Sequence, residues 1–189
     1  MPHFSDSSGT KYSKMEIYQP AEDSYFFQDF LKKYLSTSTS STTILEIGTA
    51  SGILSETAPK FIDKKNITPV DINPKSIKLL KQKGFKAIKS NLFEKIKNKY
   101  DLIIFNAPYL PLDKREPKDS QITTTGGKRG DEISVKFLKQ AKKHLNKNGK
   151  ILLLISSLTP MDKIKKFNPK IVAKKKLFME ELQILQFKN

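Results

Sequence analysis

The chain has 189 residues, a length that supports one core, so residues 1–189 are expected to form a single domain. Its 37% of hydrophobic residues, with 12 Phe among them, exclude general disorder, and the absence of Cys together with only two His excludes disulfides and leaves no expected metal site. The net charge of +16 comes from 35 Lys and Arg against 19 Asp and Glu, and 33 of these basic residues are Lys, which favours a solvated surface over nucleic-acid contacts made by Arg.

The hydrophobic pattern predicts the elements in chain order, after a polar segment over residues 1–19 that is expected to be partly flexible. Apolar residues recur at helical spacing from Glu22 to Leu35, and a Ser/Thr-rich connector ends that helix. Further helices are expected at 53–62, 73–84, 132–145 and 160–166, the first of them shortened by Pro59. Buried strands are expected at 42–48, 66–71, 85–90, 99–106, 149–157, 170–176 and 177–187.

Strands that alternate with helices and that read as continuous apolar runs indicate an α/β fold with a mainly parallel sheet. Ligands of such sheets bind beyond the carboxyl ends of the strands, so candidate residues are sought there. No apolar run approaches the roughly 20 residues needed to cross a bilayer. The polar N-terminus also lacks the apolar segment of a secretion signal, and a cytoplasmic protein with no membrane association is expected.

The first strand ends in the glycine-rich turn LEIGTASG, which begins at Leu45. Such a turn lets a ligand approach the backbone and meet free N–H groups at the start of the next helix. The spacing differs from the G-x-G-x-x-G of dinucleotide sites, and Glu46 would repel a pyrophosphate but attract a cationic ligand. An ordinary tight turn is the alternative interpretation.

The next two strands also end in polar side chains. Asp71 ends the second strand at a position that suits the hydroxyl pair of a ribose. A helix cap is the alternative for Asp71, although Asn73 is better placed to cap. Asn91 follows the third strand and is able to pair with an adenine edge, although Asn is common after strands.

The fourth strand ends in Asn106-Ala107-Pro108-Tyr109. The Asn106 side-chain oxygen and a nearby backbone carbonyl are able to accept both N–H groups of a planar NH2, and the Tyr109 ring offers a face for stacking. Pro108 restricts the backbone so that a carbonyl points inward. The pattern therefore predicts a site in which a flat nitrogen nucleophile is held in line with an electrophile. A proline-rich turn is the alternative.

Taken together, the segments YQPAEDS, LEIGTASG, VDINP, SNLF, FNAPYLP and TTGGKRGDEISVKFL resemble class I S-adenosylmethionine-dependent methyltransferases. More narrowly, the chain is similar to the short archaeal and eukaryotic form of the release-factor glutamine methyltransferases. The resemblance implies a Rossmann-like three-layer sandwich with a seven-stranded, mostly parallel sheet and a reversed last strand. It also implies N5-methylation of the glutamine in the Gly-Gly-Gln motif of a class I translation release factor, with S-adenosylhomocysteine as the second product.

The resemblance assigns roles to ten residues. It implies that the donor is bound by Ser24, Glu46, Gly48, Asp71, Ile72, Asn91 and Asn106, and that the acceptor amide is held by Asn106, Ala107, Pro108 and Tyr109. The chain departs from the family pattern at Ala50 and Ala107, where Gly and Pro are usual, and at Asn91, where Asp is usual. None of these changes removes a reacting group.

Three points stay open at this stage. Relatives of this form often pair with a small zinc-binding activator subunit, which would add a strand to a sheet edge. A nucleic-acid N6-adenine or other exocyclic-amine methyltransferase is the alternative function, and the basic residues Arg115, Lys118, Lys128 and Arg129 of the substrate-side loop 107–130 are its candidate contacts. A non-catalytic binding subunit is a third reading, which the intact set of Glu46, Asp71 and Asn106 disfavours.

Overall fold

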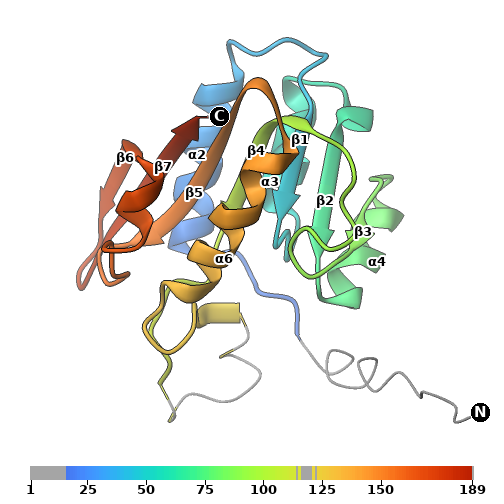
Figure 1. The fold of residues 1–189 in the computed structure, drawn as a ribbon. Coiled ribbons are helices and arrows are strands. Elements are labelled where there is room, and N and C mark those ends of the chain that lie inside the picture. The colour runs from blue at the N-terminus through green and yellow to red at the C-terminus, as the bar shows by residue number, and fades with distance from the viewer. Residues whose placement is uncertain (1–15, 114, 116–120, 122, 189) are drawn as a thin grey trace, which may run out of the picture.

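The computed structural model describes residues 16–113, 115, 121 and 123–188. Most of the N-terminal segment that was expected to be flexible, and part of the substrate-side loop with Lys118, lie outside these residues. Seven strands form one sheet in the order β3-β2-β1-β4-β5-β7-β6 (Figure 1). The strands are β1 (Ile44–Ile47), β2 (Ile67–Asp71), β3 (Ile88–Lys89), β4 (Tyr100–Asn106), β5 (Leu145–Ser156), β6 (Lys170–Lys176) and β7 (Glu181–Lys188).

The strand directions confirm the predicted α/β class. β1 pairs in parallel with β2 and β4, β2 with β3, and β4 with β5, while β7 runs antiparallel to both of its neighbours β5 and β6. The last strand is therefore the reversed one, as the resemblance implies. The parallel strands end at one edge of the sheet, which brings the residues after β1, β2 and β4 together.

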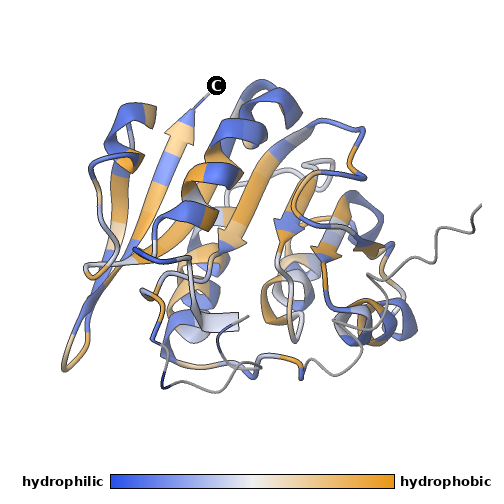
Figure 2. Ribbon diagram, turned by 60° about the horizontal axis from the view of Figure 1, so that its bottom comes forward, coloured by the Kyte–Doolittle hydropathy of each residue, from blue (hydrophilic) through white to orange (hydrophobic). Residues whose placement is uncertain are grey.

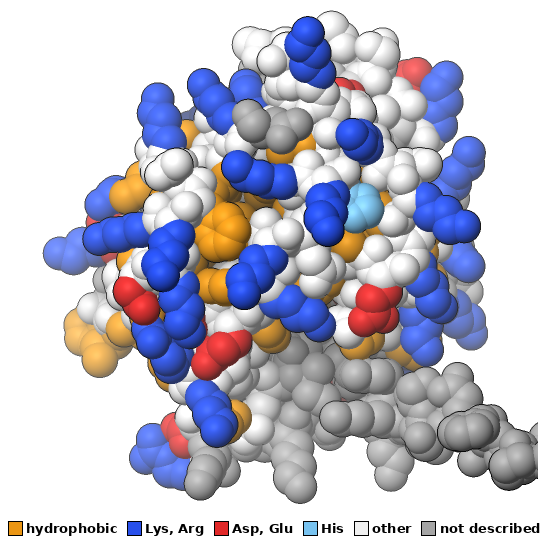
Figure 3. All heavy atoms as spheres, in the orientation of Figure 1, with side chains coloured by type: hydrophobic (Ala, Val, Ile, Leu, Met, Phe, Trp, Pro, Cys, Tyr) orange, Lys and Arg blue, Asp and Glu red, His pale blue; other side chains and the backbone are white. Residues whose placement is uncertain are grey.

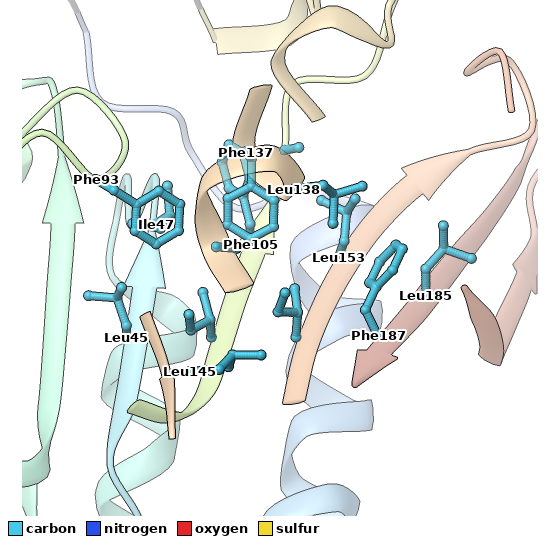
Figure 4. Close-up of a cluster of buried hydrophobic side chains, with 14 of the residues drawn as sticks. Leu45, Ile47, Phe93, Phe105, Phe137, Leu138, Leu145, Leu153, Leu185 and Phe187 are labelled. Carbon is cyan, nitrogen blue, oxygen red and sulfur yellow. The ribbon is translucent and has the colours of Figure 1, made fainter. Parts of the chain in front are cut away.

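Helices cover both faces of this sheet. The main ones among the described residues are α2 (Glu22–Leu35), α3 (Ile53–Thr57), α4 (Pro74–Gln82) and α6 (Glu132–Ala141). Phe105 of β4 packs against Phe137 of α6 on one face, in a buried cluster that also includes Phe187 of β7 (Figure 4). Leu102 and Ile104 alternate with Ile103 and Phe105 along β4, and they pack with α2, α3 and α4 on the other face. Helices on both faces explain why the central strands are mostly apolar along their length, as the hydropathy colouring shows (Figure 2).

Several predicted boundaries differ from the structure. α3 ends at Thr57 and continues as one 3-10 turn that contains Pro59, because Pro cannot donate to the helical ladder. The expected strand 85–90 pairs only over Ile88–Lys89. β5 begins at Leu145 rather than 149, with a register shift opposite Tyr100 and Leu102.

Two predicted elements near the C-terminus also change. The helix expected over 160–166 is a 3-10 turn, η4 (Ile164–Phe167). The last strand begins at Glu181, because residues 177–180 form the turn that joins it to β6, closed by a hydrogen bond from the Leu177 N–H to the Glu180 carbonyl. Phe178 and Met179 in this turn are exposed.

Lys and Arg side chains are spread over the face shown in Figure 3, with a few acidic side chains between them. This distribution agrees with a solvated Lys-rich surface. Within the part of the chain that the structure describes, no helix has the length and apolar character needed to cross a membrane.

Candidate active site

A cavity of about 440 Å³ opens beyond the carboxyl ends of β1, β2 and β4. Its walls include all ten residues to which the sequence assigned a role: Ser24, Glu46, Gly48, Asp71, Ile72, Asn91, Asn106, Ala107, Pro108 and Tyr109. The volume is in the range that holds a nucleoside-sized ligand. The structure thus brings the predicted residues together, while their individual roles stay predictions.

Glu46 is the third residue of β1, and its carboxylate is buried beneath the glycine-rich turn. Its Oε2 accepts hydrogen bonds from the hydroxyls of Thr49, at 2.9 Å, and Ser55. Burial raises the pKa of Glu46 to about 7, although both hydroxyls favour the charged form and the nearby Asp71 adds to the rise. A cationic ligand in the cavity would stabilise the ionised carboxylate.

The turn after β1 places two residues in the left-handed backbone region. Gly48 has φ 65°, and a Cβ built there would lie 2.8 Å from the Phe105 ring, so the position has room only for Gly. Ala50 has φ 47°, a conformation that a residue with a Cβ adopts at a cost. Ala50 therefore carries backbone strain in this turn.

Asp71 ends β2, and its carboxylate organises two turns. Its Oδ2 accepts from the Ala50 N–H at 2.7 Å and its Oδ1 from the Asn73 N–H at 2.8 Å. Burial raises the pKa of Asp71, opposed by these backbone N–H groups. Asn73 caps α4 by accepting from the Lys75 N–H at 2.9 Å, which confirms the predicted cap and leaves Asp71 directed at the cavity.

Asn91 follows β3 and lies on the cavity wall. Its Nδ2 donates to the Glu94 carboxylate at 2.8 Å on the exposed side. This contact holds the amide in place and uses one of its donors. The predicted pairing with an adenine edge would therefore rely on the other polar atoms of this side chain.

Asn106 ends β4 and points its side-chain amide between the cavity and the start of α2. Its Nδ2 donates to Oδ2 of Asp23 at 2.9 Å. Its Oδ1 is buried and accepts no hydrogen bond from any residue that the structure describes. A buried acceptor without a partner is rare, and here it belongs to a residue that lines the cavity, so it is available to an N–H group of a ligand.

The loop that follows Asn106 is held by a second glycine-rich segment. The Gly126 N–H donates to the Leu110 carbonyl at 2.9 Å, and Thr159 Oγ1 donates to the Tyr109 carbonyl at 3.4 Å. The Pro108 carbonyl oxygen lies only 2.6 Å from the Cβ that a side chain at position 126 would carry, so this carbonyl faces the glycine segment.

Tyr109 lies on the cavity wall and packs against the apolar cluster around α2. Burial, followed by the negative charges of Asp23 and Glu180, raises the pKa of its phenol, so the ring stays neutral. A neutral ring is suited to stacking on a planar ligand group.

Sequence reasoning missed the segment before α2, in which Glu16 and Tyr18 line the cavity. The Glu16 carbonyl accepts from Asn73 Nδ2 at 3.1 Å, and the Glu16 carboxylate pairs with Lys75 at 2.8 Å. The Tyr18 hydroxyl donates to Asp23 Oδ1 at 3.2 Å. The motif YQPAEDS was noticed in the sequence, but only Ser24 was selected from it, since nothing in the local pattern relates Asp23 to Asn106.

The two arginines of the substrate-side loop make ion pairs within the chain. Arg115 pairs with Asp113 at 2.8 Å, and Arg129 pairs with Asp162 at 2.6 Å. These contacts weaken the case for a phosphate-binding role of the arginines. Among the residues described, no cluster of three or more His, Cys, Asp or Glu is placed to hold a metal ion.

Comparisons with known proteins agree with this geometry. The family model described as methyltransferase small domain matches residues 27–179. A Methanocaldococcus jannaschii protein with the provisional name of protein N5-glutamine methyltransferase is 36% identical over 184 residues, which cover 90% of each chain. A release factor glutamine methyltransferase of Borreliella burgdorferi is 35% identical over 125 residues, 58% of this chain and 43% of that protein.

A solved structure extends the comparison to the fold. The T. thermophilus 16S rRNA N2 G1207 methyltransferase, in complex with AdoMet and guanosine, superposes with a TM-score of 0.62 at 17% identity. The superposition covers 90% of this chain and 44% of that one. At this identity the likeness concerns the fold alone.

Proposed function

The chain belongs to the methyltransferase small-domain family, and from this premise we propose that it transfers the methyl group of S-adenosylmethionine to the side-chain nitrogen of a protein glutamine. The observation that carries the proposal is the buried Oδ1 of Asn106, a residue that lines the cavity, because this oxygen has no hydrogen-bond partner among the described residues. A primary amide donates two N–H bonds and therefore needs acceptors at the place where it reacts. The names of the two relatives reported above support glutamine as the acceptor.

The cavity fits a donor of this kind. The buried carboxyl of Glu46 lies in its wall, with a pKa raised to about 7 that a cationic ligand would lower again. We assign Glu46 and Gly48 to the methionine end of the donor and Asp71 to its ribose hydroxyls. Ile72 and Asn91 are assigned to the adenine, and Ser24 to the donor carboxylate.

When bound, S-adenosylmethionine supplies an electrophilic methyl group on a sulfonium. The residues of this chain then have to hold the acceptor nitrogen in line with this methyl group. Asn106 Oδ1 accepts one N–H of the glutamine amide, and we assign the Ala107 carbonyl to the second, because the carbonyls of Pro108, Tyr109 and Leu110 face the glycine segment or Thr159. Tyr109 stacks on the amide plane. Positioning of this kind accounts for much of the rate of such reactions.

The proposed protein substrate is the Gly-Gly-Gln segment of a class I translation release factor, with N5-methylglutamine as the product. Because termination factors act on ribosomes, this substrate places the reaction in the cytoplasm. We also propose that a small zinc-binding activator subunit pairs with this chain. The two-residue edge strand β3 is a place where such a partner would add a strand.

Methylation of an exocyclic amine of a nucleobase is the second candidate. The net charge of +16 favours it, and the same Asn106 acceptor would serve a base amine. The internal ion pairs of Arg115 and Arg129 disfavour it.

The test is incubation of the purified protein with labelled S-adenosylmethionine and either a release factor or RNA, with and without a co-expressed activator. We expect one added methyl on the glutamine of the release factor, located by mass spectrometry. Asn106→Ala should abolish this transfer and keep donor binding in calorimetry. Label in RNA alone would refute the proposed substrate, and absence of donor binding under every condition would favour a non-catalytic subunit.

A further inference from the structure

We propose that Asp23 is a positioning residue that fixes which end of the Asn106 amide faces the acceptor. The inference deepens the proposed function, because it rests on Asn106 accepting an N–H of the substrate amide. The two ends of an Asn side chain have nearly the same size and opposite hydrogen-bonding character. A site that needs Oδ1 at one point therefore needs something that rejects Nδ2 there.

The Asp23 carboxylate supplies that discrimination. Asn106 Nδ2 donates to Asp23 Oδ2 at 2.9 Å, although the two residues are 83 positions apart in the chain. An ionised carboxylate only accepts, so a turned Asn106 would set its own Oδ1 against Asp23 Oδ2 and lose the hydrogen bond. Only 7% of Asp23 is exposed, and little water is available to compensate for this repulsion. In the orientation that remains, Oδ1 is the end of the amide that has no partner among the described residues, and Asn106 lines the cavity.

Asp23 is itself prevented from turning away. Its other oxygen, Oδ1, accepts from the Ser24 N–H at 2.6 Å, from the Ser24 hydroxyl at 3.2 Å and from the Tyr18 hydroxyl at 3.2 Å. Three donors at one oxygen leave the second oxygen for Asn106. The first turn of α2 and the segment before it therefore set the orientation of a side chain at the end of β4.

The variant Asp23→Asn tests whether Asp23 sets the orientation of the Asn106 amide. The three donors around Oδ1 would keep an acceptor at that place, so the new Nδ2 would face Asn106. Asn106 would then turn to present its oxygen to residue 23 and its Nδ2 to the acceptor site. We expect kcat to fall about 100-fold in Asp23→Asn, because the acceptor amide meets a donor, while the Kd for S-adenosylmethionine stays within about threefold.

Asp101→Asn is a matched control at the opposite end of β4. Asp101 Oδ1 accepts from Asn146 Nδ2 at 2.8 Å, and its Oδ2 accepts from the Thr43 N–H at 2.9 Å. Asp101→Asn replaces one carboxylate oxygen by an NH2 group, as Asp23→Asn does, and it therefore disturbs hydrogen bonds of the same kind far from the cavity. We expect Asp101→Asn to lower thermal stability at least as much as Asp23→Asn and to leave kcat unchanged.

A second measurement uses the wild-type protein and does not depend on the folding of any variant. The proposal requires an NMR scalar coupling across the hydrogen bond between Asn106 Nδ2 and the Asp23 carboxyl carbon. It also requires that the chemical shift of the Asn106 side-chain NH2 show a hydrogen bond to a carboxylate. Absence of the coupling would overturn the proposal. A wild-type kcat in Asp23→Asn would also overturn it, as would a loss of donor binding large enough to account for the lower turnover of this variant. If Asn106→Ala itself kept wild-type turnover, the proposed role of Asn106 would fail instead.

Discussion

The carboxylate of Asp71 accepts a 2.7 Å hydrogen bond from the backbone N–H of Ala50, across 21 residues of sequence. The bond ties the end of β2 to the turn that follows β1, and the same carboxylate also accepts from Asn73 at the start of α4. Asp71 thus stabilises both turns that border the donor side of the cavity. Asp71 therefore contributes both to the shape of this side and to its charge.

Asp71→Ala should weaken donor binding by about 1–3 kcal/mol, because a charged acceptor is lost and two backbone N–H groups lose their partner. Calorimetric titration with S-adenosylmethionine measures the effect. Asp63→Ala is the control, since the Asp63 side chain makes an exposed ion pair with Lys65, and its loss should leave the affinity unchanged. Equal affinity of Asp71→Ala and the wild type would contradict the assignment of Asp71 to the donor.

Ala50→Gly should stabilise the protein. A residue with a Cβ in the left-handed region costs roughly 1–2 kcal/mol, whereas Gly loses about 0.5–1 kcal/mol more entropy on folding, so the free energy of unfolding should rise by up to about 1.5 kcal/mol. Ala141→Gly at the end of α6 should instead lower it by about 1 kcal/mol or more, because Gly is a poorer helix former and a buried methyl group is lost. Urea denaturation compares the two, and a loss of stability in both variants would show that Ala50 is not strained.

The buried carboxyl of Glu46 should make stability depend on pH. Its pKa of about 7 lies above the ordinary value of 4.5, so folding favours the protonated form. The stability that Glu46 contributes is therefore complete below about pH 4.5 and is lost as the pH rises to about 7. Glu46→Gln cannot ionise, and its free energy of unfolding should fall less than that of the wild type over this window.

Donor binding should show the opposite trend. A cationic donor prefers the ionised Glu46, so the affinity of the wild type should increase as the pH rises through about 7. The increase should be smaller in Glu46→Gln. Asp71 also has a raised pKa and is present in both proteins, so the comparison isolates Glu46. Identical pH profiles of the two proteins, in binding and in denaturation, would contradict the raised pKa.

The sequence predicted the fold and the place of the site because both follow from local patterns. Apolar runs identify buried strands, and the ends of parallel strands share one edge of the sheet. Asn73 was predicted to cap α4 because an Asn before a Pro at the first helical position is a local signal. The boundaries of β3 and β5 were wrong because pairing with a neighbouring strand decides how far a strand extends.

The contact between Asp23 and Asn106 was beyond sequence reasoning for a related reason. It joins the second residue of α2 to the last residue of β4, and no periodicity relates two positions of different elements. Asp23 instead looks like an ordinary acidic residue in the first turn of a helix, where its charge suits the helix dipole. Only the packing of α2 against the sheet reveals its partner.

The glycine segment that holds the Asn106 loop gives the last prediction. Gly130 has φ 93°, and a Cβ there would lie 2.6 Å from the Tyr109 carbonyl oxygen and 3.1 Å from the Pro111 nitrogen. Gly130→Ala must therefore displace the backbone that carries Tyr109, and kcat should fall tenfold or more, on the order of the loss that a small misplacement causes. Donor affinity should change little, because Glu46 and Asp71 are not touched.

Gly84→Ala is the control for this variant, because Gly84 has φ 80° but only Lys64 Nζ lies near its Cβ position, at 3.6 Å. Both variants carry a similar left-handed backbone strain, so both should lose thermal stability, Gly130→Ala more because of its backbone clash, whereas only Gly130→Ala should lose turnover. Steady-state kinetics with a release factor substrate, together with thermal denaturation of each variant, separates the two effects. Equal turnover in the two variants would mean that the 126–130 segment does not position the acceptor loop.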